Sequence, residues 1–588
     1  MKDKKGFTLL ELLAVIAILA LLVIITVPNI INLYNEARKK TFITEVKKLH
    51  SSAEEKFVSS SVTGKPSKIY NSEDDTKLNM TGEKLQYCIL MDDRGNVRSL
   101  KASNKQWIAS IDENKKIDDL SVDDLEDGNL DEYECIDDTA PVIPKSCTYT
   151  GELVQGAEYV YGQYTYRYKQ EMGDSGWQNI TSDGWGVVLT DKESTVAISG
   201  EVCKSINDKP VLSGSNAFSN SKAESIDLSE FNASGITNMY KMFQGTSATT
   251  LNLSNLDTSN VTNMSSMFQS NAATTITGLN KLNTSNVTNM SNMFNSSKAT
   301  SLDLSSFDTS KVTNMISMFQ SSAATSISGL NNFNTSSVTN MSNMFNGSKV
   351  TSLNLSSFDT SKVTNMAFMF KSSAATSITG LNKFNTSNVT TMNGMFQSSK
   401  ATSISLNGLN AQNVTNFASM FQNSFATTID LTNFKTSKAT TMASMFYTAN
   451  ATSIKGLSTL NTASVTDMSQ MFYKTKLSSV DLSGFNTSNV TNMSYMFYWC
   501  TSSSINLSSF DTSKVTNMTY MFFNSKRLKT IYASSKFVTT KVTNSSSMFS
   551  MCSALVGGAS TKYSNLKIDK AYARIDGGTS SPGYFTSK

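Results

Sequence analysis

The chain opens with a long apolar stretch that continues into an amphipathic one. Residues 7–27 are apolar apart from Glu11. At 1.5 Å per residue they would form a helix of about 31 Å, the thickness of a bilayer core. Apolar residues then recur at helical spacing up to Pro66, at Phe42, Val46, Leu49, Ala53 and Phe57. The pattern predicts one helix over residues 7–66, with residues 7–27 as its transmembrane part.

The next segment predicts a small β-rich head over residues 67–140. The apolar run at residues 85–91 is typical of a strand. An acidic segment at residues 112–138 is more readily explained as a solvated loop than as a calcium site, because it has an apolar residue at a ligand position. Cys88 and Cys135 would close this loop as a disulfide.

A second β-rich segment is expected over residues 141–210. It contains a row of alternating tyrosines, which more often fills one face of a sheet than binds sugar. Cys147 and Cys203 bracket the segment, and we predict that they form a second disulfide. The alternating tyrosines are Tyr159, Tyr161, Tyr164, Tyr166 and Tyr168.

The rest of the chain is a repeat of mostly 25 or 26 residues. Its most regular part is Val-Thr-Asn-Met-x-x-Met-Phe or a close variant, and we call its first residue the anchor. This period predicts a solenoid, which we assign to residues 211–556, with a C-terminal cap over residues 557–588. The thirteen anchors are Ile236, Val261, Val287, Val312, Val338, Val363, Val389, Val414, Ala439, Val465, Val490, Val515 and Val542.

Two hydrophobic periodicities alternate within each repeat. In the repeat anchored at Val312, Leu302 and Leu304 alternate as in a strand. From Val312 to Phe319 the apolar residues fall at i, i+3, i+6 and i+7, as on one helix face. We therefore expect one strand and one helical turn per coil. The fold class predicted for the whole chain is α+β and multidomain, ending in a solenoid of about 13 coils.

Four repeats with one extra residue carry a glycine nine residues before the anchor. We interpret these glycines as bulges that absorb the insertion without turning core residues outward. They are Gly278, Gly329, Gly380 and Gly456.

In other repeats the same position holds a polar residue between two inward-facing apolar residues, so it should point to solvent. This polar column is the first candidate binding face, although any exposed strand position is commonly polar. Its members are Asp227, Asn252, Asp303, Asn354, Ser405, Asp430, Asp481 and Asn506.

Aromatic residues give a second candidate face. Tyr495 and Tyr520 both stand five residues after their anchors in successive coils, so they should stack about 4.8 Å apart. Tyr498 and Trp499 lie nearby in the sequence. Such aromatics can mark a recognition surface, and packing against the cap explains them equally well.

Composition excludes several classes of function. The net charge of +4 is small for 588 residues and does not suggest nucleic-acid binding, and a single histidine argues against most metal and acid–base sites. We find no catalytic motif, and we expect no enzyme activity, no cofactor and no bound metal. Cys500 and Cys552 stand at equivalent positions two coils apart, about 9.6 Å, which is too far for a disulfide. We predict two free, largely buried thiols.

The N-terminus resembles the class III signal of type IV prepilins across residues 2–28. It has a basic leader, then Gly6, then Phe-Thr-Leu-Leu-Glu-Leu-Leu. The resemblance implies that a prepilin peptidase removes residues 1–6 by cutting after Gly6 and methylates Phe7. It further implies that Glu11 pairs with the amino terminus of a neighbouring subunit. A long helix with a small sheet is also what a pilin looks like.

The repeats, with the closing sequences at residues 571–578 and 582–586, resemble the BspA-type leucine-rich-repeat surface proteins of bacteria. That resemblance covers residues 216–588. It implies a leucine-rich-repeat solenoid with a role in adhesion.

Together these features predict a minor type IV pilin-like protein that displays a binding domain on a pilus. Expected partners are other pilins, the prepilin peptidase, the cytoplasmic membrane before assembly, and a surface protein or glycan; DNA is disfavoured because we find no dense basic run with interleaved aromatics. The chain would be a single-pass membrane protein before assembly and extracellular afterwards. The alternative is a pseudopilin of a secretion or DNA-uptake system whose repeats bind cargo.

Overall fold

The computed structural model describes residues 9–63, 67, 69–72, 77–78, 84–92, 95–112, 115–128, 130, 147–200 and 202–588. For residues 9–12, 21–32 and 62–63 it describes the backbone alone. The chain forms two compact units, Met1–Ile143 and Pro144–Lys588, and each is described by itself.

The first unit packs one long helix on an antiparallel sheet. Helix α1 runs over Leu9–Thr63, and the predicted stripe is buried, from Phe42 with no exposed surface to Phe57 at 7%. The Phe42 ring lies 6.5 Å from that of Trp107 on the sheet. In sheet order the strands are β1 (Ile69–Asn71), β2 (Gln86–Met91), β3 (Val97–Ser103), β4 (Trp107–Ile111) and β5 (Glu126–Asp127). Two short 3-10 turns, η1 (Ile117–Asp119) and η2 (Val122–Asp124), precede β5.

Among the described residues, no helix is both long enough and apolar enough to span a membrane.

The second unit begins with a small sheet whose tyrosines face its core. Tyr161, Tyr164, Tyr166 and Tyr168 are buried around Trp185, as expected for residues that fill one face of a sheet. The sheet has the order β11 (Ser205–Ile206), β12 (Lys209–Ser213), β10 (Trp185–Leu189), β7 (Tyr164–Tyr168) and β6 (Glu158–Tyr161). A hairpin of β8 (Gln170–Gly173) and β9 (Gly176–Asn179) lies beside it.

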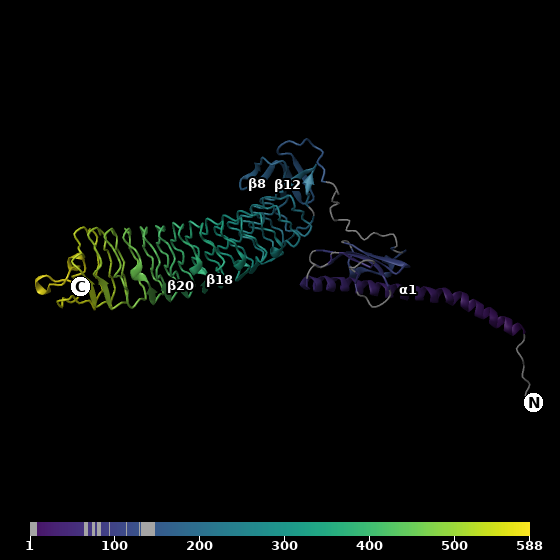
Figure 1. Cartoon of the computed structure of the whole chain (residues 1–588). Coiled ribbons are helices and arrows are strands. Elements are labelled where there is room, and N and C mark those ends of the chain that lie inside the picture. The colour runs from purple at the N-terminus through teal and green to yellow at the C-terminus, as the bar shows by residue number, and fades with distance from the viewer. Residues whose placement is uncertain are drawn as a thin grey trace, which may run out of the picture. The chain divides into compact units, whose positions relative to one another are not determined.

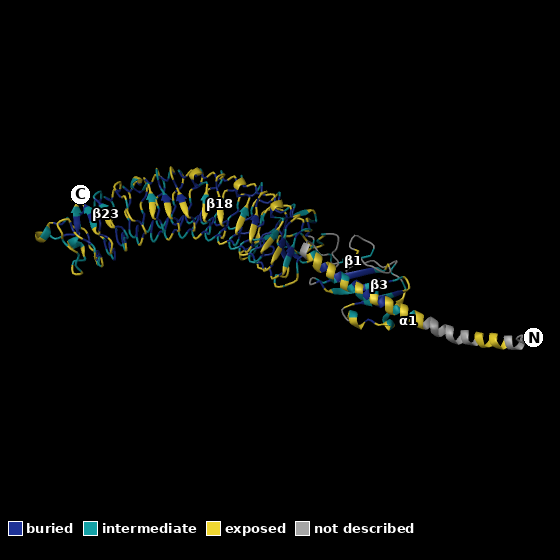
Figure 2. Cartoon of the chain, turned by 90° about the horizontal axis from the view of Figure 1, so that it is seen from below, coloured by how far each residue is buried: buried dark blue, intermediate teal, exposed yellow. Residues whose placement is uncertain are grey.

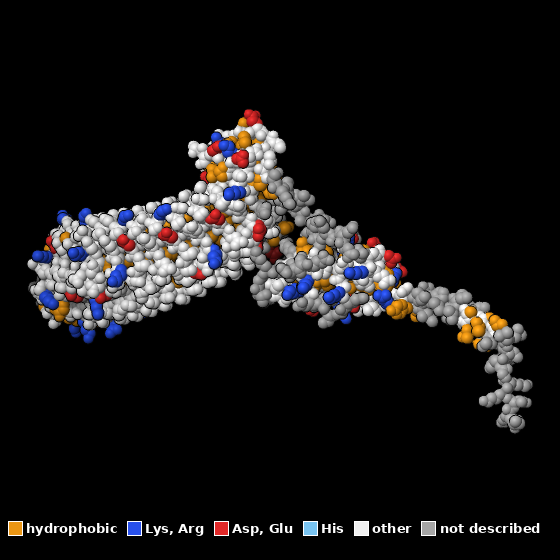
Figure 3. Space-filling view, turned by 45° about the vertical axis from the view of Figure 1, so that its right-hand side comes forward, with side chains coloured by type: hydrophobic (Ala, Val, Ile, Leu, Met, Phe, Trp, Pro, Cys, Tyr) orange, Lys and Arg blue, Asp and Glu red, His pale blue; other side chains and the backbone are white. Residues whose placement is uncertain are grey.

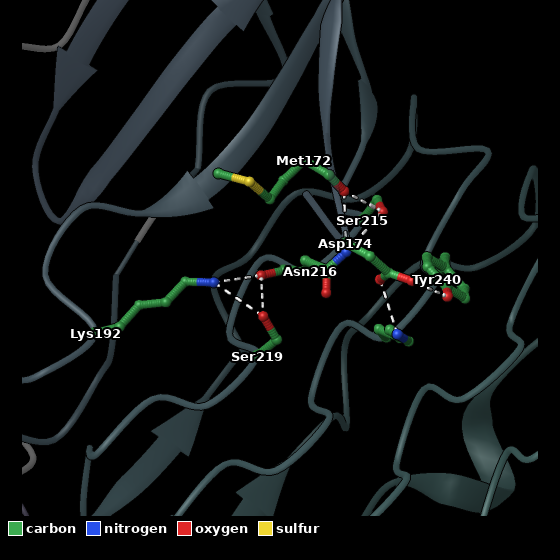
Figure 4. A network of polar contacts seen from close by, with 8 residues as sticks. Met172, Asp174, Lys192, Ser215, Asn216, Ser219 and Tyr240 are labelled. Carbon is green, nitrogen blue, oxygen red and sulfur yellow. Dashed lines mark hydrogen bonds and ion pairs between the residues drawn. The ribbon is translucent and has the colours of Figure 1, made fainter. Parts of the chain in front are cut away.

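The end of β10 and the segment that follows it bond to the first coils of the solenoid. Figure 4 shows one part of this contact, where Lys192 reaches Asn216 and Ser219. Leu189 N donates to Ala217 O at 3.0 Å, and Ile198 N donates to Ser225 O at 2.9 Å. Lys192 Nζ donates to Asn216 O at 2.7 Å, and burial lowers the pKa of Lys192 to about 8. The segment therefore supplies the hydrogen-bond partners that a preceding coil would have given.

The bridges between coils define fourteen coils, one more than the thirteen predicted. Figure 1 shows the coils stacked one after another towards the C-terminus. Bridges between equivalent residues run coil by coil from Ser213 to Asn544. The extra coil is the first, anchored at Val211. Its sequence, Val-Leu-Ser-Gly-Ser-Asn-Ala-Phe, replaces both methionines of the pattern by Gly214 and Ala217. This coil therefore does not match the repeat pattern, although Phe218 stacks on Phe243 like the phenylalanine of every other coil.

Columns of equivalent, mostly apolar side chains fill the interior. Buried residues recur along the solenoid from coil to coil (Figure 2). The phenylalanine seven residues after each anchor forms one stack from Phe218 to Phe549, with ring centroids 5.3–5.9 Å apart. The anchor and the two methionines beside it form further columns with almost no exposed surface. Each coil thus covers the core of its neighbour.

The predicted helical turn is wrong. In the described residues 213–556 the segments that begin at the anchors form a bridge and successive tight turns. Met315 N donates to Asn340 O in the next coil at 3.2 Å, and Phe319 N donates to Met344 O at 2.9 Å. Ser317 and Ser321 have φ of 56° and 53°, and these left-handed residues stop each turn from continuing as a helix.

A short strand in most coils adds a narrow parallel ladder. These strands are β13 (Ser225–Asp227), β14 (Thr250–Asn252), β15 (Thr275–Thr277), β16 (Ser301–Asp303), β17 (Ser326–Ser328), β18 (Ser352–Asn354), β19 (Ser377–Thr379), β20 (Ser403–Ser405), β21 (Thr428–Asp430), β22 (Ser453–Lys455), β23 (Ser504–Leu507) and β24 (Thr530–Ala533). The ladder is interrupted after β15, β17, β19 and β22.

Each interruption follows one of the four predicted glycines. The glycine is not a bulge inside the strand, as we expected, but the N-cap of a 3-10 turn that takes up the extra residue. Gly380 has φ of 88°, and a Cβ there would lie 2.4 Å from Ser356 N. Both the backbone conformation and the close approach therefore require glycine. The turns are η3 (Leu279–Lys281), η4 (Leu330–Asn332), η5 (Leu381–Lys383) and η6 (Leu457–Thr459).

The C-terminal cap is organised around one buried carboxylate, Asp576. It accepts hydrogen bonds from Ala559 N, Thr561 Oγ1, Gly578 N and Gly583 N at 2.6–3.3 Å. Burial alone would raise the pKa of Asp576, but these hydrogen bonds outweigh it and lower the pKa to about 2. The cap also contains η7 (Lys570–Tyr572), η8 (Gly578–Ser580) and β25 (Phe585–Ser587), which pairs with β24.

We expect Gly380→Ala to destabilise the solenoid by about 3 kcal/mol or more, because it combines left-handed strain with a backbone clash. Gly408→Ala is the matched control, since Gly408 has φ of 77° but nothing within 4 Å of the added Cβ. It should cost about 1 kcal/mol. Thermal melting followed by circular dichroism measures both variants. Equal losses would show that the close approach does not matter.

Asp576→Asn should lower the melting temperature at pH 7, because an amide presents donors to backbone N–H groups. The carboxylate has a folded pKa of about 2, below its ordinary 3.8. Its stabilisation is therefore fully present above about pH 4 and is lost as the pH falls through about 2. Melting curves from pH 7 to pH 2 should show a smaller acid-induced loss in Asp576→Asn than in the native chain. Asp569→Asn, at an exposed position in the same cap, should behave like the native chain.

Candidate binding surfaces

The residues implied by the prepilin resemblance fall mostly outside what the structure describes. Gly6 and Phe7 lie outside the described residues. Glu11 lies in helix α1, and its side chain is not described.

The structure describes three of the four cysteines that we predicted to form disulfides. Cys147 and Cys203 are joined, with their Cα atoms 5.8 Å apart. Cys88 on β2 is disulfide-bonded. Its predicted partner, Cys135, lies outside the described residues.

The predicted polar column has a structural function in its own coils. Asp303 accepts hydrogen bonds from Ser305 N at 3.2 Å and from Ser328 Oγ at 2.8 Å, and these hydroxyl and backbone donors lower its pKa. Asp430 Oδ1 likewise accepts from Thr432 N at 2.9 Å. A side-chain oxygen that accepts a hydrogen bond from the backbone N–H of the second residue after it stabilises the turn that follows the strand. Asp227, Asn354, Asp481 and Asn506 repeat this contact.

A polar groove opens beside this column between β19 and β20. It has a volume of about 390 Å³ and follows the glycine coil that ends a ladder. No titratable side chain lines it, so it can offer hydrogen bonds but no acid–base chemistry. Its lining is Thr376–Asn382, Thr402, Ser403 and Ser405.

Tyr495 and Tyr520 stack as predicted, with ring centroids 5.0 Å apart. Both have left-handed backbone, with φ of 57° and 54°, and so does Trp499, with φ of 54°. Most other coils place Ser, Asn or Gly at these positions, residues that tolerate this conformation better than bulky ones do. Aromatic side chains therefore occupy these positions although the local backbone conformation disfavours them. Tyr495 and Tyr520 are half-buried and Trp499 is exposed, so together they form a surface feature of the last coils.

A second aromatic column was missed by sequence reasoning. Tyr447, Tyr473, Tyr498 and Phe523 stack with ring centroids 4.4, 4.5 and 4.9 Å apart. The signal was present, because all four stand eight residues after an anchor in successive coils. Earlier coils hold Gln, Asn, Lys or Ser at this position.

The two remaining cysteines are free and buried, as predicted. Burial raises the pKa of Cys500 to about 11 and that of Cys552 to about 12. Both are therefore thiols rather than reactive thiolates at neutral pH. Within the part of the chain that the structure describes, no group of three His, Cys, Asp or Glu side chains could hold a metal ion.

The fold and these surfaces define a repeat protein, a β-solenoid capped at both ends. The family model described as "Mycoplasma protein of unknown function, DUF285" matches residues 212–328, 300–378, 321–423, 372–456 and 448–561, which together span more than half of the chain. The chain belongs to this family. The prokaryotic N-terminal methylation motif matches residues 1–27. No curated protein and no solved structure matches the chain.

Proposed function

We propose that the chain is a minor type IV pilin-like surface protein that displays its solenoid on a pilus as a non-enzymatic binding domain. The observation that carries this proposal is the N-terminal methylation motif at residues 1–27, which suggests a pilin-like protein. Helix α1, with a buried stripe on a small antiparallel sheet, supports it as well. The resemblance of the repeats to BspA-type leucine-rich-repeat proteins adds the adhesive role.

In this proposal each part has its own task. Residues 7–27 hold the chain in the membrane until a prepilin peptidase cuts after Gly6 and methylates Phe7. Glu11 then pairs with the amino terminus of a neighbouring pilin, which compensates a carboxylate in an apolar environment. The second half of α1 holds the sheet of the first unit. The solenoid is exposed to a surface protein or glycan.

The structure of the solenoid suits a domain that displays a binding surface. The backbone hydrogen bonds of the segments that begin at the anchors, together with the phenylalanine stack, connect every coil to the next. The exposed side chains are therefore held in fixed columns. The fourteen coils at about 4.8 Å would extend over roughly 65 Å. Such a bulk on every subunit would crowd a filament, which favours a minor subunit.

The first expected outcome concerns the N-terminus. Mass spectrometry of the mature chain should find N-methylated Phe7 as its first residue, and Gly6→Val should block the cut. Glu11→Gln should be cut normally but be absent from filaments, because it removes the charge that pairs with a neighbour. Glu55→Gln, exposed on the same helix, is the matched control and should assemble. A mature chain that begins elsewhere would refute the pilin assignment.

A second outcome concerns the binding domain. Because β11 and β12 complete the small sheet, a clean deletion has to remove residues 144–588 rather than the repeats alone. The shortened chain should still enter filaments, seen by electron microscopy, while cell adherence is lost. Intact adherence would contradict the proposal, and a loss of secretion or DNA uptake in its place would favour the pseudopilin alternative.

A further inference from the structure

In the eleven coils anchored from Val261 to Val515, one side of the solenoid carries no acidic residue. We call it the turn face and define it by the residues four to thirteen after each of these anchors. The acidic residues of these coils all lie outside it; they are Asp257, Asp303, Asp308, Asp359, Asp430, Asp467, Asp481 and Asp511. Its basic residues are Lys298, Lys349, Lys371, Lys400, Lys474, Lys476, Lys526 and Arg527. Figure 3 shows Lys and Arg side chains along the solenoid and gathered near its C-terminal end.

Five of these lysines form one regular column, eleven residues after the anchor. Lys298, Lys349, Lys400, Lys476 and Lys526 are all exposed. Most stand two coils apart, a spacing of about 9.6 Å. Their backbones are fixed: the N–H groups of Lys349 and Lys400 donate to the preceding coil at 3.1 and 3.0 Å. None of the five forms an ion pair with another described residue.

In a second lysine column, one residue before the anchor, most members have an acidic residue close by in the sequence. Lys311, Lys362 and Lys514 stand three residues after Asp308, Asp359 and Asp511, whereas Lys438 stands three residues after Lys435. Hydrogen bonds from Ser310 lower the pKa of Asp308, and the charge of Lys311 lowers it further. The pKa of Asp359 is lowered in the same way, with Lys362 contributing. Unbalanced positive charge is therefore a property of the turn face.

The aromatic columns lie on the C-terminal part of the turn face. They indicate which kind of negatively charged polymer the lysines of this face could bind. The rings of Tyr447, Tyr473, Tyr498 and Phe523 stack on one another, so their faces are covered and their edges remain. Lys474 Nζ lies 4.5 Å from the centre of the Trp499 ring. Proteins that bind single-stranded nucleic acid stack bases on open aromatic faces. Ring edges, hydroxyls and ammonium groups suit the hydroxyls and acidic groups of a sugar chain.

We propose that the turn face binds a linear acidic polysaccharide, whose carboxylate or sulfate groups recur along an extended chain. This inference rests on the proposed function and gives the chemical class of the displayed domain's ligand. The five lysines eleven residues after the anchor contact the acidic groups of the polysaccharide at regular intervals. The aromatic columns at the C-terminal end of the turn face add contacts to the sugar rings.

The test measures binding of the full-length chain, kept in detergent, to immobilised heparin and hyaluronan at several salt concentrations. Lys298, Lys349, Lys400 and Lys476 are replaced together by Gln. Binding should weaken about tenfold or more, and the slope of log Kd against log salt should become shallower by roughly three, since fewer counterions are released. The matched control replaces Lys311, Lys362, Lys455 and Lys514 by Gln. It removes the same charge from exposed positions that lie outside the turn face and have an acidic residue nearby, and it should change Kd less than about twofold.

Three results would overturn the proposal. They are equal losses in the two quadruple variants, no binding of either glycan at physiological salt, and tighter binding of a thymidine oligonucleotide of equal charge. Melting curves of both variants check that each is folded. Incorporation into filaments is measured in parallel, and a variant that assembles but does not bind glycan separates this inference from the pilin assignment.

Discussion

The structure of the repeat domain depends on the hydrogen bonds between equivalent backbone positions of neighbouring coils. Thr313 N donates back to Thr288 O, and Met315 N donates forward to Asn340 O, so each coil is held from both sides. A backbone group that missed its partner inside such a stack would have no water to bind instead. The coils are therefore kept in register, and any side chain has its equivalent in the next coil as a neighbour. Core columns and surface columns both follow from this register.

The same constraint explains where the ladder is interrupted. A coil with one extra residue would shift every following side chain unless the residue is removed from the register locally. The 3-10 turn after Gly278, Gly329, Gly380 or Gly456 does this, at the loss of the strand pairing to the next coil. The polar groove between β19 and β20 results from that loss. The groove therefore depends on the length of the repeat as well as on the residues that line it.

The sequence predicted the features that depend on spacing alone. The helix stripe from Phe42 to Phe57, the Cys147–Cys203 disulfide, the free thiols and the stacked Tyr495 and Tyr520 are all found. Spacing could not separate a helix from successive tight turns, because both bring residues i, i+3 and i+7 to one side. Left-handed positions such as Ser317 distinguish the two, and serine there gives only a weak signal.

The charge of the candidate surfaces also follows from the turn chemistry of the coil. Asp is well suited to two positions of the coil, the last residue of the strand and the residue four before the anchor. There its carboxylate accepts a hydrogen bond from the backbone N–H two residues on, as in Asp303 and Asp308. Acidic residues used in this way stay on those sides of the solenoid. At the left-handed positions of the turn face Ser, Asn and Gly prevail, and the lysines nearby have no carboxylate beside them. The separation of charge is therefore built into the repeat, and a binding surface for anions needs few further substitutions to arise.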